Sequence, residues 1–133
     1  MISAADLRRS QEASRQERDA KIVERVRSAS TKYVDIILEE AKKALEYAQR
    51  TNKSYIILDH RDITRDVEGL SYTTLLYGFW DRSTEKFDDS IFIKNDIPRP
   101  LDRAIAELEK FGYKLENVSD PTRSRRLFLK LSW

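Results

Sequence analysis

The last third of the chain, residues 97–133, constrains the fold most, because it contains a complete series of start and stop signals. Pro100 suits the first turn of a helix, where its missing N–H costs nothing. Gly112 supplies the left-handed residue that commonly ends a helix. Between them an apolar stripe at helical spacing comprises Leu101, Ala104, Ile105, Leu108 and Phe111. The segment predicts a helix that begins at a proline and ends before a glycine.

Two strands are predicted after this helix. Tyr113 and Leu115 begin the first strand, and residues 120–124 have the composition of a turn. The second strand places four large side chains on one face by strict alternation: Leu127, Leu129, Leu131 and Trp133. A hairpin alone is marginally stable in water, so this face should pack on the preceding helix and on an earlier part of the chain. The order helix, strand, turn, strand is typical of the end of a winged helix.

The longest periodic segment lies between Ile22 and Ala48. Apolar side chains recur there at steps of three and four residues, which predicts a long helix. The serine and threonine residues at 28–31 offer a capping point, so the segment is either one helix or a helix pair.

Residues 1–20 lack this apolar periodicity, because Ile2 and Leu7 are their only large aliphatic residues. Oppositely charged pairs four residues apart, such as Arg8 and Glu12, support a helix weakly. A helix without an apolar face is either a solvated arm or a segment that docks on a partner. We therefore predict a polar basic helical arm at residues 1–20 and a single α+β domain at 21–133.

The middle of the chain carries short apolar runs between polar ones. The predicted elements are a strand at residues 55–58, a polar turn at 59–62, an irregular segment or short helical turn at 62–69, a helix at 70–80 capped by Ser71, a polar loop at 81–90 and a short strand or extended segment at 91–93. The threonines and aromatic residues at 70–80 would also suit a strand, but the apolar pairs four residues apart favour a helix. Helices and strands do not alternate regularly, so the fold class is α+β with a small mixed sheet.

Composition argues against several kinds of function. The 133 residues include no cysteine and one histidine, which excludes thiolate metal sites and paired-histidine chemistry. The three glycines are isolated, so the chain has no glycine-rich phosphate loop. It lacks an apolar run long enough for a membrane span and the apolar core of a secretory signal, which indicates an intracellular protein. We expect no enzyme, no cofactor and no metal.

One cluster of polar residues follows the strand at 55–58. Asp59, His60 and Asp62 could form a metal or acid–base site at the end of that strand. The alternative is a solvated turn whose side chains bond the local backbone, and this is the interpretation that we favour.

Both ends of the chain are basic, although the net charge is only +2. The candidate partner-binding residues are Arg8, Arg9, Arg15 and Arg18, and the candidate nucleic-acid-binding residues are Arg123, Arg125, Arg126 and Lys130. A basic wing can contact phosphate. The predicted helix before it is neutral to acidic, however, which does not suit DNA recognition. The basic hairpin can also be read as charged protection against edge-to-edge strand pairing.

The C-terminal sequences FGYKL, at 111–115, and LKLSW, at 129–133, resemble the C-terminal pattern of small uncharacterised proteins of large DNA viruses and tailed phages. The resemblance implies a viral origin and a role in the virion or its assembly, in the virion or in the host cytoplasm or nucleus. We therefore expect a non-enzymatic structural or assembly protein, a minor virion component whose arm binds neighbouring protein subunits. The alternative is a winged-helix-like nucleic-acid-binding protein that uses its basic C-terminal hairpin.

Overall fold

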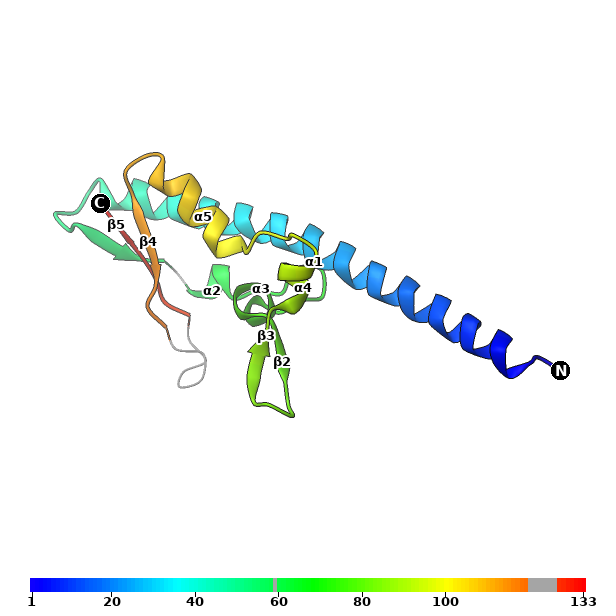
Figure 1. Cartoon of the computed structure of the whole chain (residues 1–133). Coiled ribbons are helices and arrows are strands. Elements are labelled where there is room, and N and C mark those ends of the chain that lie inside the picture. Colours follow the sequence, from blue (N-terminus) through cyan, green and yellow to red (C-terminus); the bar gives the residue numbers. More distant parts are fainter. Residues whose placement is uncertain (59, 120–126) are drawn as a thin grey trace.

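A single helix, α1 (Ala4–Ala48), runs the length of the molecule in a computed structural model that describes residues 1–58, 60–119 and 127–133 (Figure 1). Of the two alternatives, one helix or a pair divided near residues 28–31, the structure has the single helix. Ala29 and Ser30 are buried there, and the Thr31 hydroxyl donates to the Arg27 carbonyl one turn back. The Thr31 side chain therefore bonds the preceding turn of the same helix and does not cap a second one.

The C-terminal region forms the predicted helix and hairpin. Its elements are α5 (Pro100–Glu109), β4 (Lys114–Asn117) and β5 (Leu129–Ser132). Proline lies in the first turn of α5, and Gly112 has φ +85°, as the helix-stop signal predicted. The turn predicted at 120–124 lies outside the described residues.

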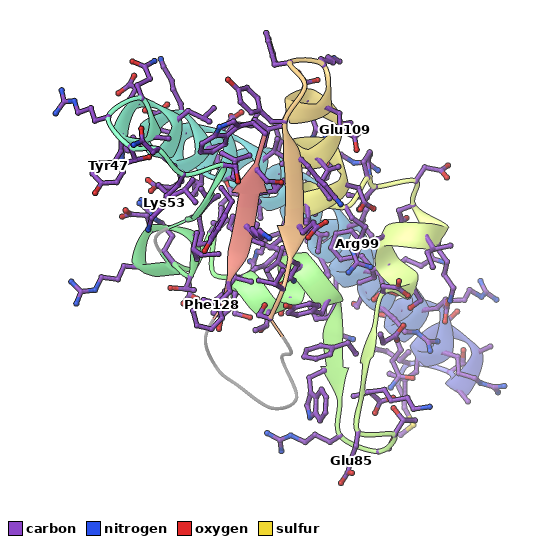
Figure 2. All side chains as sticks on the ribbon, turned by 90° about the vertical axis from the view of Figure 1, so that its left-hand side faces the viewer. Tyr47, Lys53, Glu85, Arg99, Glu109 and Phe128 are labelled. Atoms are coloured by element: carbon purple, nitrogen blue, oxygen red, sulfur yellow. The ribbon has the colours of Figure 1, made fainter. Side chains whose placement is uncertain are left out.

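The third strand of the sheet, β1 (Tyr55–Ile57), pairs with β5 and gives the order β1-β5-β4. Both pairings are antiparallel, so the sheet is not mixed as predicted. The strand β1 comes from a distant part of the chain and pairs with the free side of β5. The two strands run in opposite directions, so this pairing adds no parallel pair to the β4–β5 hairpin. Figure 2 shows the sheet lying beside α1 and α5.

The apolar face of the hairpin packs as predicted. Leu127, Leu129 and Leu131 are at most 1% exposed, and they share one core with residues of α1 and α5. Phe111 and Trp133 were expected in the same core but are 76% and 45% exposed. Each lies beyond the end of its element, so the periodicity that positions the earlier residues no longer applies to it.

The middle region differs more from the predictions. It contains α2 (His60–Ile63), α3 (Tyr72–Tyr77), β2 (Phe79–Asp81), β3 (Lys86–Asp88) and α4 (Ser90–Lys94). Ser71 caps α3 as predicted, but the helix ends at Gly78, whose φ is +102°. Phe79 and Trp80 therefore belong to a strand. The predicted polar loop at 81–90 contains β3, which pairs with β2 to form a projecting hairpin with Glu85 near its tip (Figure 2).

The short strand predicted at 91–93 is also wrong, because these residues form part of helix α4. The Asp88 carboxylate accepts the Ser90 N–H at the start of this helix, 2.9 Å away. One helical turn then places Phe92 in a small core with Val26 of α1 and Ile97. The helix thus buries Phe92, whereas the three-residue apolar run by itself is compatible with either helix or strand.

Arg99 connects these short elements. Its guanidinium donates to the Asp89 carboxylate at 2.9 Å and to the Leu76 carbonyl, and its charge lies 4.9 Å from the centre of the Phe92 ring. One side chain therefore joins the end of α3, the start of α4 and the segment that enters α5.

Candidate functional site

The most distinctive surface is the N-terminal part of α1. All residues from 1 to 22 are exposed, and the rest of the molecule lies along only the C-terminal part of the helix (Figure 1). Ala4 to Ile22 correspond to about 28 Å of projecting helix. Contact with the body begins at Val23 and Val26, which pack against Phe92 and Ile97. We call residues 1–22 the arm.

The arm begins with a regular cap. The Ser3 side chain accepts the N–H of Asp6 at 3.1 Å, which satisfies one of the free donors at the helix start. Its other contacts are also local, and they include the pair of Arg15 with Glu12 and the pair of Lys21 with Glu17 at 3.3 Å. Exposed pairs of this kind contribute roughly 0–1 kcal/mol each. The arm is therefore ordered by weak local interactions, with all of its side chains available to a partner.

The four candidate arginines of the arm are exposed but do not share one face. At 3.6 residues per turn, Arg8, Arg15 and Arg18 lie within an arc of about 80°, whereas Arg9 points about 100° or more away from each of them. Arg9 approaches Asp6 instead, at 4.0 Å. The helix thus brings three of the predicted residues together and separates the fourth.

Only Lys130 of the candidate nucleic-acid-binding residues can be placed, because Arg123, Arg125 and Arg126 lie outside the described residues. The Lys130 ammonium lies 4.9 Å from the centre of the Tyr55 ring, across the β1–β5 pair. This cation–π contact stabilises the sheet, and the Lys130 ammonium is engaged with the ring. The exposed surface of α5 carries three carboxylates against two cations: Asp102, Glu107, Glu109, Arg103 and Lys110. It does not resemble a surface that binds DNA.

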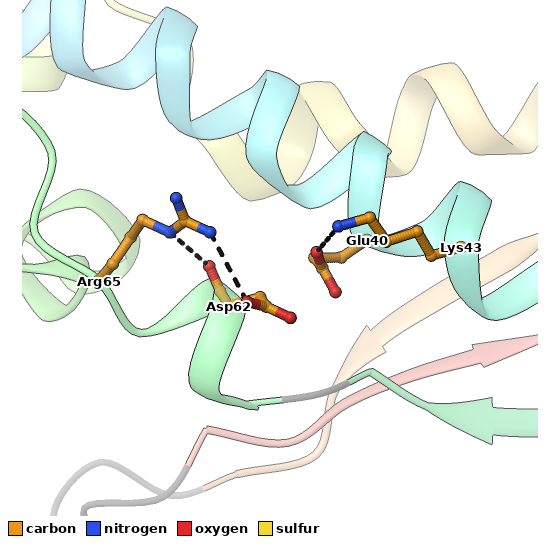
Figure 3. A network of polar contacts seen from close by, with 4 residues as sticks. All are labelled: Glu40, Lys43, Asp62 and Arg65. Carbon is orange, nitrogen blue, oxygen red and sulfur yellow. Dashed lines mark hydrogen bonds and ion pairs between the residues drawn. The ribbon is translucent and has the colours of Figure 1, made fainter.

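Of the cluster predicted after β1, only the side chain of Asp62 lies among the described residues. Asp59 lies outside them, and His60 begins helix α2 where a polar turn was expected. Asp62 pairs with Arg65 at 3.6 Å, beside the Glu40–Lys43 pair of α1 (Figure 3). Among the described residues, three or more metal-ligating side chains do not gather anywhere in a way that could hold an ion.

Sequence reasoning missed Glu40, which is only 6% exposed. It accepts a hydrogen bond from Lys43 at 3.2 Å, and this bond raises the pKa of Lys43. The signal was present, since Glu40 lies beside the apolar positions Ile37 and Ala41 of α1. Its carboxylate is paired with a neighbour on its own helix, so we read it as part of the α1–α2 contact and not as a reactive group.

A shallow cleft lies where the arm meets the body, and the sequence did not predict it. Its lining residues are Lys21, Glu24, Arg25, Ser28 and Glu68. Glu68 arrives from a tight turn, in which Glu68 and Gly69 both have positive φ. Hydrogen bonds from Lys32 and then from Ser28 hold the pKa of Glu68 below its usual value. The cleft therefore has two cations and the Glu24 carboxylate on the α1 wall and the ionised carboxylate of Glu68 on the other.

Comparisons with family models, with curated proteins and with solved structures find no match to this chain. In the described part of the chain, the helices are too short or too polar to cross a membrane.

Proposed function

We propose that this chain is a non-catalytic assembly protein whose arm binds a neighbouring protein subunit. The observation that carries the proposal is the exposure of every residue from 1 to 22, of which residues 4–22 belong to one continuous helix. The body supplies a packed core that anchors the other half of the same helix, so the arm is held at a fixed direction.

The projecting helix has little to stabilise it without a partner. The anchored half of α1 supplies its nucleus, but the arm buries no apolar face and its local ion pairs add little. Docking on another subunit would bury the arm and stabilise it. Helix-in-groove binding is a common way for an extended helix to be recognised, and it needs no cavity on the helix itself.

The C-terminal resemblance to viral proteins makes a virus particle the first assembly in which we propose to look for this partner. The nucleic-acid-binding alternative has less support. The exposed charge of α5 is net negative, and Lys130 is engaged with Tyr55. Its remaining basis is the arginine content of a segment outside the described residues.

The test compares the full chain with a variant that lacks residues 1–20. Because those residues are exposed, the deletion should change the free energy of unfolding by less than about 0.5 kcal/mol. The native complex formed in the cells that produce the chain, measured by sedimentation and mass, should be lost. A complex of unchanged mass and stoichiometry with the truncated chain would refute the proposal, and so would a native protein that sediments as a free monomer.

A further inference from the structure

Five cations of the arm and of the first residues after it lie along one side of α1, and no acidic residue lies among them. At about 100° per residue, the five cations fall within an arc of about 140° on α1. Two aliphatic side chains lie in the same arc, Leu7 at 49% and Ile22 at 42% exposure. We call this surface the basic stripe: Leu7, Arg8, Arg15, Arg18, Lys21, Ile22 and Arg25.

Acidic residues border the basic stripe on both sides of the helix. They occupy the remaining directions around the axis, beginning about 20–40° beyond the edges of the stripe. We call them the acidic rails: Asp6, Glu12, Glu17, Asp19 and Glu24. The arm is therefore polar all round but not uniform, and its charges are sorted by face.

This sorting acts against the free helix. Arg15, Arg18, Lys21 and Arg25 follow one another at steps of three and four, so each is a like-charged neighbour of the next. Like charges at these spacings destabilise a helix. The exposed pairs of Arg15 with Glu12 and of Lys21 with Glu17 offset this repulsion only weakly. A partner of opposite charge would remove the repulsion along the whole line, which spans about 27 Å from Leu7 to Arg25.

The basic stripe also leads to the cleft at the base of the arm. Lys21 and Arg25 belong to the stripe and line the cleft beside Glu24, opposite Glu68. A rod-shaped partner that follows the stripe would therefore end against the body, where the cleft can receive its last turn. The basic stripe would thus set the direction of the partner along α1, and the body would limit how far the partner extends.

We infer that the basic stripe binds an acidic α-helix of a neighbouring subunit, an inference that rests on the proposed function of the arm. A second helix touches only a narrow strip of α1, so the acidic rails would stand at the edges of the contact, where coiled coils place their interhelical charge pairs. The partner should then carry carboxylates along its centre, cations at its edges, and apolar residues facing Leu7 and Ile22.

The acidic rails also explain why a helix fits better than DNA. The major groove is about 12 Å wide, close to the diameter of a helix with its side chains, so phosphates would flank both sides of an inserted arm. The acidic rails would face those phosphates. Repulsion on both sides would oppose the attraction of the basic stripe.

The test uses the full chain and three defined probes. The first is a helical peptide of 22 residues with glutamates along one face and two leucines spaced to meet Leu7 and Ile22. The second is the same peptide with glutamine for glutamate, and the third is a 20-base-pair DNA duplex. Binding is measured by fluorescence anisotropy at two salt concentrations. We expect the acidic peptide to bind most tightly and to lose affinity as salt rises.

Two matched variants locate the contact. Arg18→Gln changes the centre of the basic stripe, whereas Arg9→Gln makes the same change on the other side of the arm. Arg18→Gln should weaken peptide binding roughly two- to fivefold, and Arg9→Gln should leave it unchanged. Equal effects of the two variants, no binding of the acidic peptide, or tighter binding of the duplex would each overturn the inference. If truncation of the arm still abolishes the native complex, the proposed function survives that result.

Discussion

Gly78 is the position at which a single added methyl group should be most damaging. It joins α3 to β2 with φ +102° and ψ −174°, a conformation that other residues rarely adopt. A Cβ atom there would lie 2.4 Å from the Asp88 carbonyl oxygen and 2.9 Å from the Asp89 nitrogen. An ordinary contact is longer by about 1 Å, so β3 would have to move by about that distance.

The expected cost of Gly78→Ala follows from two contributions. The backbone conformation alone costs about 1–3 kcal/mol for a residue with a side chain. Moving β3 also disturbs its pairing with β2, in which Phe79 lies opposite Asp88. We therefore expect the free energy of unfolding to fall by about 3 kcal/mol or more, at the upper end of single-residue effects.

Urea unfolding measures this loss, with tryptophan fluorescence and near-ultraviolet circular dichroism as the signals. Trp80 reports on the hairpin, because its ring meets the Phe87 ring edge-on at 5.0 Å. Gly112→Ala is the matched control: φ is +85°, but nothing lies within 4 Å of the added Cβ atom. Strain alone should cost the control about 1–2 kcal/mol. If both variants lose the same free energy, the argument from the close approach of Asp88 is wrong.

Three further predictions concern the core and its edges. Tyr33→Phe removes the hydroxyl that donates to the Ile63 carbonyl, so it should cost about 1–3 kcal/mol at pH 7. Burial raises the pKa of Tyr33 above its ordinary value of 10.0, so the unfolded chain ionises first and the native protein loses stability as the pH rises above that value. Urea midpoints at pH 8 and 10.5 should therefore fall less in Tyr33→Phe, and an unchanged alkaline slope would contradict the burial argument. Arg99→Lys keeps the charge but loses the planar fork, and thermal unfolding should show a loss of about 1–3 kcal/mol; full stability would show that the guanidinium geometry is unimportant. Leu131→Ala should cost about 2–5 kcal/mol in urea unfolding, whereas Phe111→Ala, 76% exposed in the native state, should cost less than about 0.5 kcal/mol; similar losses would contradict the placement of both side chains.

The sorting of charge on the arm could have been predicted from the sequence. Comparing residues only in pairs four positions apart does not reveal it. Arg8, Arg9, Arg15 and Arg18 look equivalent when they are counted along the chain. Only their directions around one uninterrupted helix separate Arg9 from the other three. The cleft at the base of the arm could not be predicted from the sequence, because a turn far along the chain brings Glu68 to α1.

The sequence by itself determined the elements whose signals lie within one segment: the apolar period of α1, the proline start and Gly112 stop around α5, and the alternation of Leu127, Leu129 and Leu131. Backbone sterics and side-chain periodicity act over a few residues, so such elements need no knowledge of their neighbours. The tertiary structure decided the short segments. Residues 79–81 became a strand because Gly78 ends α3 and the following residues pair with β3, which lies later in the chain. Residues 91–93 became part of a helix in which Phe92 is buried against Val26 and Ile97, although a run of three apolar residues suits either state.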